Sequence, residues 1–178
     1  MATQRCGLTI HSWGKSANQQ ISKSLRVKPS MEIAQFNVAA MLAPIHSPAL
    51  ADFVAELERI NQLAEASQGF VWRAHFDLAN PTAIACRLGS NMVINLSVWS
   101  SIDELHTFTY RTAHAEVMSK RSTWFSQQAD ACSVLWWVQP DHRPTLLEAK
   151  QRLDALRQHG PSETAFTFKK RFAMPTDR

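Results

Sequence analysis

The stretch MVINLSVWSSIDELHTFTYRTAHAEVMSKRSTWF, residues 92–125, decides the fold of this chain. Its first eight residues are mostly β-branched, aromatic or large and apolar, which predicts a strand over 92–99. Ser101 and Glu104 then have the spacing of a capping box, in which a hydroxyl and a carboxylate satisfy free N–H groups at a helix start. We therefore expect a strand that leads directly into one long helix ending near Phe125.

The expected helix presents two stripes of side chains. Apolar residues recur every three positions from Ile102 to Phe108 and should face a sheet. Tyr110, His114 and Arg121 recur at helical spacing and should share a second stripe, so that a phenol, an imidazole and a guanidinium point into one cavity. The alternative is an ordinary half-exposed helix face with a packed tyrosine and a surface arginine.

The residues before this stretch predict a strand, a helix and a second strand. Residues 31–40 (MEIAQFNVAA) are largely apolar, as in a strand. Ser47 is a candidate helix N-cap, and the apolar residues that follow it fit the i, i+3, i+4, i+7 spacing of a helix until Gly69. Residues 70–76 predict the second strand, and residues 82–88 a short additional one.

The residues after the stretch predict a strand and a final helix. CSVLWWVQP (132–140) is strand-like, and Thr145 opens a second capping box with Glu148. The helix that follows should run to His159, before a Gly-Pro pair that stops it. Residues 165–172 alternate between apolar and polar, which predicts a small edge strand.

The expected order is β-α-β-β-α-β followed by an extra C-terminal helix. This order is that of the split βαβ, or ferredoxin-like, unit, so the fold class is α+β. The strands are interpreted as apolar on both faces, and helices on one face would leave the other exposed. Two such sheets packed face to face form a dimeric α+β barrel, so we expect a homodimer.

Charge divides the chain into a leader and one domain. The net charge of the 178 residues is +4, but residues 1–30 carry five basic and no acidic residues, which leaves −1 for the rest. We expect residues 1–30 to be a disordered basic leader, with an organellar targeting segment as the alternative. Residues 31–175 then form the single barrel domain. Its lack of a basic stripe argues against nucleic acid as a partner.

Cysteine content and hydropathy indicate the cellular compartment of the protein. Cys6, Cys86 and Cys132 form neither a disulfide framework nor a CxxC metal motif, which favours a reducing compartment. No apolar run approaches the roughly 18 residues that a membrane span needs. We therefore expect a cytoplasmic protein without a membrane span.

Several blocks of the sequence resemble one protein family. They are IAQFN (33–37), GFVWR (69–73), NLSVW (95–99), the run from Tyr110 to His114, RSTWF (121–125), LWWVQPDHRPT (135–145) and AFTFKKRF (165–172). In this order they resemble an uncharacterised bacterial domain-of-unknown-function family, number 3291, of the dimeric α+β barrel superfamily. That superfamily is related in fold to antibiotic-biosynthesis monooxygenases. Its members include cofactor-free monooxygenases, haem enzymes and ligand-sensing domains, so the resemblance implies a fold more specifically than an activity.

The first functional hypothesis is an enzyme. The resemblance implies a monooxygenase-like oxidoreductase that takes an apolar or aromatic small molecule into a cavity between sheet and helices, with haem as a candidate cofactor. His114 would be the general base or, if haem is bound, its axial ligand. Tyr110 would orient the imidazole or the substrate, and Arg121 would pair with a carboxylate. The candidate substrate-binding residues are Trp99, Trp124, Trp136, Phe108, His75 and His142.

The second hypothesis is a non-catalytic ligand- or haem-binding dimer. His114 is then a core histidine with its hydrogen bonds satisfied, and Arg121 belongs to a structural ion pair. The sequence contains no GxGxxG, P-loop, HExxH or nucleophile-elbow motif, so nucleotide, zinc-protease and serine-hydrolase chemistry lack support.

Overall fold

The computed structural model describes residues 31–76 and 91–175. The expected leader, residues 1–30, and the additional strand over residues 82–88 lie outside the described residues. The strands are β1 (Glu32–Ala40), β2 (Phe70–Arg73), β3 (Met92–Trp99) and β4 (Ser133–Val138). The helices are α1 (Ala51–Glu65), α3 (Ile102–Arg111), α4 (Ala113–Ser119) and α5 (Leu146–His159), with 3-10 turns η1 (Pro48–Leu50) and η2 (Arg121–Thr123).

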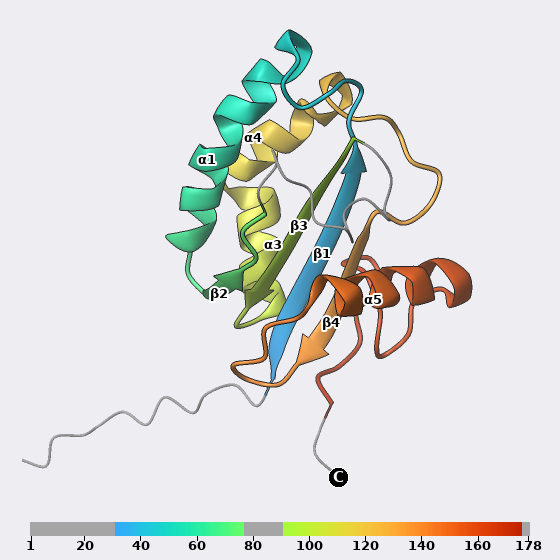
Figure 1. Ribbon diagram of the computed structural model, residues 1–178. Coiled ribbons are helices and arrows are strands. Elements are labelled where there is room, and N and C mark those ends of the chain that lie inside the picture. Colours follow the sequence, from blue (N-terminus) through green and yellow to red (C-terminus); the bar gives the residue numbers. More distant parts are fainter. Residues whose placement is uncertain (1–30, 77–90, 176–178) are drawn as a thin grey trace, which may run out of the picture.

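The four strands form one antiparallel sheet in the order β2-β3-β1-β4 (Figure 1). Strand β1 lies in the centre, with Asn37 opposite Asn95 of β3 and Gln35 opposite Leu135 of β4. The sequence order of strands and helices is the expected one, and the α+β class is confirmed.

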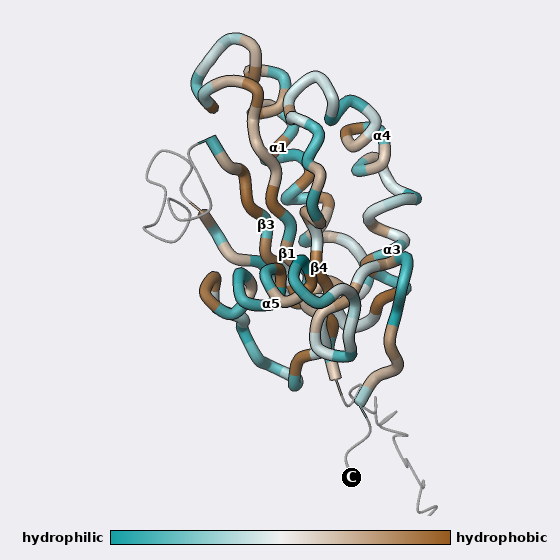
Figure 2. The backbone as a smooth tube through the Cα atoms, turned by 90° about the vertical axis from the view of Figure 1, so that its right-hand side faces the viewer, coloured by the Kyte–Doolittle hydropathy of each residue, from teal (hydrophilic) through white to brown (hydrophobic). Residues whose placement is uncertain are grey.

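The two faces of the sheet are covered by different helices. Helices α1, α3 and α4 lie on one face, and α5 crosses the other (Figures 1 and 2). Leu153 and Leu156 of α5 are buried in the same cluster as Phe36 of β1. The face that we expected to be exposed is therefore covered within the chain. The exposed-face argument for a homodimer is wrong, and the homodimer itself stays a prediction.

The expected long helix is interrupted at Thr112. This residue is extended (φ −118°, ψ −177°), so α3 ends at Arg111 and the short α4 begins at Ala113. The Thr112 hydroxyl donates to the Phe108 carbonyl at 2.7 Å and accepts from the His114 N–H at 3.2 Å. Because a threonine hydroxyl can bond to nearby backbone groups in this way, it offers the chain an alternative to helical hydrogen bonds.

Local capping signals mostly match the structure. The Ser101 and Thr145 hydroxyls accept hydrogen bonds from the Glu104 and Glu148 N–H groups, as both capping boxes predict. Ser47 precedes η1 but makes no side-chain cap bond. The described residues contain no helix that is both long and apolar enough to cross a membrane.

The strand predictions at 70–76 and 165–172 are correct only in part. Strand β2 ends at Arg73, and the Ala74 N–H adds one further bond to the Leu96 carbonyl at 2.9 Å. In the last segment, Phe166 alone pairs with Leu135 of β4, through two backbone hydrogen bonds of 2.8 and 2.9 Å. The rest of that segment forms turns instead of an edge strand.

Candidate functional site

One face of the sheet carries a patch of polar side chains at its centre. Gln35 and Asn37 of β1 lie opposite Ser97 and Asn95 of β3, and Arg73 of β2 lies on the other side of Ser97. We call these five residues the polar patch. Alternation along a strand places them all on the face that α1, α3 and α4 cover. The opposite face is apolar and includes Ala34, Phe36, Val38, Ile94, Leu96, Val98, Val134, Trp136 and Val138.

Internal hydrogen bonds satisfy only part of the polar patch. The Trp99 indole N–H donates to the Ser97 hydroxyl at 3.1 Å, and that hydroxyl donates to Gln35 Oε1 at 3.4 Å. The side-chain oxygen Oδ1 of Asn37 is buried and has no partner among the described residues. Leaving a buried polar group unpaired costs about 1–3 kcal/mol. The patch is therefore not explained by fold stability alone.

A small cavity lies between the helices and three residues of the polar patch, Arg73, Asn95 and Ser97. Its volume is about 30 Å³, which is room for about two water molecules. Asn95 is exposed whereas Ser97 and Trp99 are buried, so the cavity opens to solvent at Asn95. We call it the polar pocket. Its lining residues are Ile60, Asn61, Ala64, Phe70, Arg73, Asn95, Ser97, Trp99, Phe108 and His114.

His114 reaches the polar pocket because α4 starts a new helix after Thr112. Its Nδ1 lies 3.1 Å from the Thr109 carbonyl oxygen. A carbonyl can only accept a hydrogen bond, so Nδ1 carries the proton and Nε2 is the basic nitrogen. Nε2 has no hydrogen-bond partner among the described residues. Burial lowers the pKa of His114, and the weaker effect of the bond to Thr109 opposes this shift, so the ring is neutral at pH 7.

Phe108 forms the wall between the polar pocket and a second hollow. Its ring stacks on Trp99 with centroids 4.9 Å apart and lies 4.8 Å from the His114 ring centroid. On its outer side is an open groove of about 320 Å³. The groove is lined by Ser67, Gln68, Asp103, Glu104, Thr107, Phe108 and Thr112. One aromatic side chain thus separates the small polar pocket from a larger open groove.

Arg73 supplies the pocket with a cation. Its Nε donates to Glu65 Oε1 of α1 at 2.6 Å. The Arg73 side chain is only 15% exposed, whereas that of Glu65 is 42% exposed. The two Nη groups of Arg73 have no hydrogen-bond partner within residues 31–76 and 91–175. The ion pair therefore fixes one edge of the guanidinium and leaves both Nη groups without a partner among the described residues.

The structure brings together three of the predicted site residues, Trp99, Phe108 and His114. It does not bring Tyr110 and Arg121 to them. Tyr110 is 51% exposed and packs against Phe168, and Arg121 is exposed in η2. The expectation of one shared stripe is wrong, because the break at Thr112 changes the direction of the chain between Tyr110 and His114.

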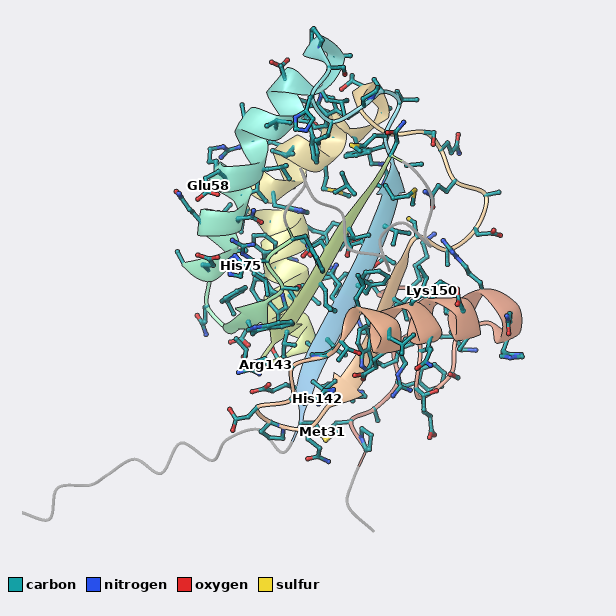
Figure 3. The ribbon with its side chains drawn as sticks, viewed as in Figure 1. Met31, Glu58, His75, His142, Arg143 and Lys150 are labelled. Atoms are coloured by element: carbon teal, nitrogen blue, oxygen red, sulfur yellow. The ribbon has the colours of Figure 1, made fainter. Side chains whose placement is uncertain are left out.

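The other predicted pocket residues lie elsewhere. Trp124 packs against Phe53 in a separate cluster. Trp136 faces α5, where its indole N–H donates to Glu148 Oε1 at 3.0 Å. His75 is exposed beyond β2. His142 is exposed and lies 2.8 Å from Glu148 Oε2. Figure 3 shows His75 and His142 in different parts of the molecule.

Sequence reasoning missed the polar half of the site, namely Arg73, Asn61, Asn95 and Ser97. A signal was present in the strands. Polar residues recur at every second position in IAQFN and in NLSVW, which is the spacing of one face of a strand. The interpretation of both faces as apolar overlooked this alternation.

Haem and metal ions do not fit the residues described. The polar pocket has about a tenth of the lower volume limit, about 300 Å³, of ordinary ligand sites. Within the described ranges no group of three or more His, Cys, Asp or Glu side chains is arranged to hold a metal ion. The polar pocket therefore gives haem binding no support, and haem binding stays a prediction.

A comparison with protein families identifies the chain. The model of a domain of unknown function, DUF3291, matches residues 32–178. The chain belongs to the DUF3291 family. The predicted family is confirmed. The match says nothing about the predicted relation to monooxygenases, which stays a prediction. No curated protein matches the chain.

Two solved structures resemble this member of the family. One is a protein of unknown function from Nitrosomonas europaea, 16% identical, with a TM-score of 0.40, covering 66% of this chain and 96% of its own. The other is a conserved protein from Methanosarcina mazei Go1, 12% identical, with a TM-score of 0.42, covering 63% of this chain and 95% of its own.

Proposed function

We propose that this DUF3291 protein is a small-molecule enzyme of the monooxygenase-like type and that the polar pocket is its active site. The proposal rests on the position and the protonation state of His114. It lines a polar pocket with a neutral imidazole whose Nε2 has no hydrogen-bond partner among the described residues. A neutral imidazole near physiological pH is well suited to general-base catalysis.

The residues around His114 suit the removal of a proton from an aromatic alcohol. Trp99 and Phe108 provide aromatic walls for a substrate ring. His114 Nε2 takes the hydroxyl proton, and the resulting anion is stabilised by the positive charge of Arg73 and by the amide donor of Asn95. Dioxygen, the co-reactant, then oxidises the electron-rich anion: one oxygen atom is added to the ring to give a quinone, and the other leaves as water with the ring hydrogen and the proton held by His114. This outcome is what the resemblance to antibiotic-biosynthesis monooxygenases implies.

A substrate ring needs more room than the polar pocket provides. Displacement of the Phe108 ring joins the pocket to the groove of about 320 Å³ on its outer side. The combined space lies within the usual range of ligand sites, about 300–1,000 Å³. Phe108 therefore acts as the movable wall of the proposed active site.

The fold supports only part of the predicted superfamily relation. The antiparallel order β2-β3-β1-β4 is the strand order of a ferredoxin-like unit. The face that would form a dimeric barrel is covered by α5. A homodimer therefore rests on the family resemblance alone and is not needed for the chemistry proposed here.

Oxygen uptake with a panel of naphthols and hydroquinones tests this function. His114→Ala should reduce turnover at least about a hundredfold, the smallest contribution typical of a general base. His75→Ala, the same change at an exposed histidine outside the pocket, should leave turnover unchanged. Full turnover by a folded His114→Ala protein, or no turnover of any compound by the wild type, contradicts the proposal.

A non-catalytic ligand-binding protein is the second candidate. The observation that favours it is the size of the polar pocket, which admits little more than two water molecules while Phe108 stays in place. Such a protein would bind members of the same panel and release them chemically unchanged. Recovery of the bound compound by mass spectrometry separates this function from the enzymatic one.

A further inference from the structure

We propose that the ligand of the polar pocket carries a carboxylate; this inference rests on the proposed active site. The Nη groups of Arg73, which have no partner among the described residues, would bind the carboxylate while Glu65 holds the other edge of the same guanidinium. The sequence suggested Arg121 for this role, but Arg121 is exposed in η2, away from the pocket lining. The structure offers Arg73 instead.

The geometry of Arg73 suits two carboxylates at once. A guanidinium presents five N–H donors in a planar fork, and one carboxylate occupies at most one edge of it. Glu65 Oε1 bonds to Nε at 2.6 Å, which orients the plane. The two Nη groups, which have no hydrogen-bond partner in the part of the chain that the structure describes, are left to receive a second carboxylate end-on. Glu65 thus positions Arg73, and it also partly neutralises its charge.

The charge of the lining selects an anion. Among the described residues that line the polar pocket, Arg73 is the only one that is charged, because His114 is neutral and no carboxylate contributes to the wall. Asn61 and Asn95 add amide donors. A cation with neutral donors around it favours an anion over a cation, and Glu65, which bonds to Arg73 from outside the lining, reduces this preference without reversing it.

The size and the charge of the site select a carboxylate over a phosphate. A volume of about 30 Å³ accommodates about two water molecules, and the two oxygens of a carboxylate can replace them. Arg73 already shares its charge with Glu65, so the site tolerates one further negative charge more readily than the two of a phosphate dianion, and the described lining contains no second cation. The rest of the ligand would then extend past His114 and Phe108.

Titration with benzoate, followed by calorimetry and by the NMR signal of the Trp99 indole N–H, tests this assignment. The wild type should bind benzoate saturably, and at least tenfold more tightly than the neutral isostere benzamide. Arg73→Gln should lose at least tenfold in benzoate affinity. Arg73→Lys should retain part of it, because an ammonium keeps the charge but not the bidentate fork.

Glu65→Gln is the matched variant, and it should change benzoate affinity in the opposite direction from Arg73→Gln. It removes the competing negative charge and keeps an acceptor for the Arg73 Nε, so benzoate affinity should rise severalfold. A folded Arg73→Gln protein with unchanged benzoate affinity, equal binding of benzoate and benzamide, or no saturable binding by the wild type overturns the proposal.

Turnover by His114→Ala distinguishes this proposal from the proposed function. If His114→Ala loses turnover while Arg73→Gln keeps wild-type benzoate affinity, the active site stands and the carboxylate assignment fails. If the Arg73 and Glu65 variants behave as expected but His114→Ala keeps full turnover, the pocket binds carboxylates and the general-base role fails.

Discussion

His114 is subject to two opposing effects on its pKa. Burial beside Phe108 disfavours the imidazolium and lowers the pKa, and the hydrogen bond from Nδ1 to the Thr109 carbonyl favours it and raises the pKa. Burial is the larger effect. The residue therefore keeps Nε2 unprotonated at pH 7, which both a general base and an acceptor of a ligand hydrogen bond require.

The lowered pKa of His114 predicts a loss of stability in acid. In the unfolded chain the ring binds a proton near its ordinary pKa of about 6.5, but the folded protein binds it only at lower pH. Between these two values the unfolded state holds more protons, so the free energy of unfolding falls as the pH falls, by at most about 1.4 kcal/mol per pH unit from this residue. Above the ordinary value the effect vanishes.

Denaturant titrations between pH 8 and pH 5 measure this dependence. His114→Asn keeps an N–H donor for Thr109 but has no titrating group, so its stability should fall less steeply with acid than that of the wild type. Equal slopes for the two proteins contradict the assignment of a lowered pKa to His114.

At the scale of secondary structure, the break between α3 and α4 positions the site. The Thr112 hydroxyl bonds both to the last turn of α3 and to the first turn of α4. Without the break, His114 would continue the stripe of Tyr110, which is half exposed. The interruption therefore brings the imidazole to the sheet.

Thr112→Ala should destabilise the protein by about 0.5–2 kcal/mol, the usual cost of losing a helix cap. Thr107→Ala is the matched control, because Thr107 is exposed on α3 and its side chain makes no hydrogen bond with any residue that the structure describes. Its effect should stay within about 0.5 kcal/mol. Chemical denaturation measures both, and equal effects would show that the Thr112 hydroxyl does not hold the break.

The turn before β2 depends on a glycine that packs against α3. Gly69 has a φ of +79°, and a Cβ at this position would clash with the side chain of Glu104. Gly160, at the end of α5, has a similar φ of +73° but open space around it. The two glycines share the backbone requirement and differ in the packing requirement.

Gly69→Ala should therefore cost more stability than Gly160→Ala, by about 1–3 kcal/mol, the usual cost of overpacking. The backbone cost is common to both variants and cancels in the comparison. Thermal and denaturant unfolding of the two proteins side by side give the difference. If Gly160→Ala is as destabilising as Gly69→Ala, Glu104 does not pack against the turn in solution.

The elements were predictable from the sequence where their signals are local. The capping boxes at Ser101 and Thr145 involve residues three apart, and the structure contains both. The break at Thr112 was not predicted, because the residues around it have good helical spacing and only the hydroxyl bonds reveal it. His114 was identified as a site residue, but for a stripe that does not form.

The polar residues of the site were not predicted from the sequence, for a different reason. Gln35 and Asn37 alternate with large apolar residues, and α5 buries that apolar set on the opposite face of the sheet. Which helix covers which face depends on contacts between residues distant in sequence. Periodicity within a strand assigns its residues to two faces, but it does not predict which helix covers each face.

At the scale of the whole molecule, α5 closes the sheet face that a dimeric barrel would use. Leu153 is fully buried against the strands, whereas Leu147 on the same helix is 51% exposed. If α5 keeps this position in solution, the two leucines should respond very differently to truncation.

Leu153→Ala should destabilise the protein by about 2–5 kcal/mol, as for other buried leucines. Leu147→Ala should change stability by no more than about 0.5 kcal/mol. Denaturant unfolding of both variants, with light scattering of the wild type, examines the arrangement. Small effects at both positions together with a dimeric wild type would mean that a partner sheet replaces α5.

The proposed active site depends on a neutral His114 whose Nε2 is free of a proton, and an NMR titration of its ring nitrogens measures this state. Long-range proton–nitrogen spectra distinguish the two tautomers, and comparison with His114→Ala assigns the signals. We expect a proton on Nδ1 at pH 7 and a pKa below the ordinary value of about 6.5. A proton on Nε2 at pH 7, or a pKa at or above the ordinary value, would contradict this expectation.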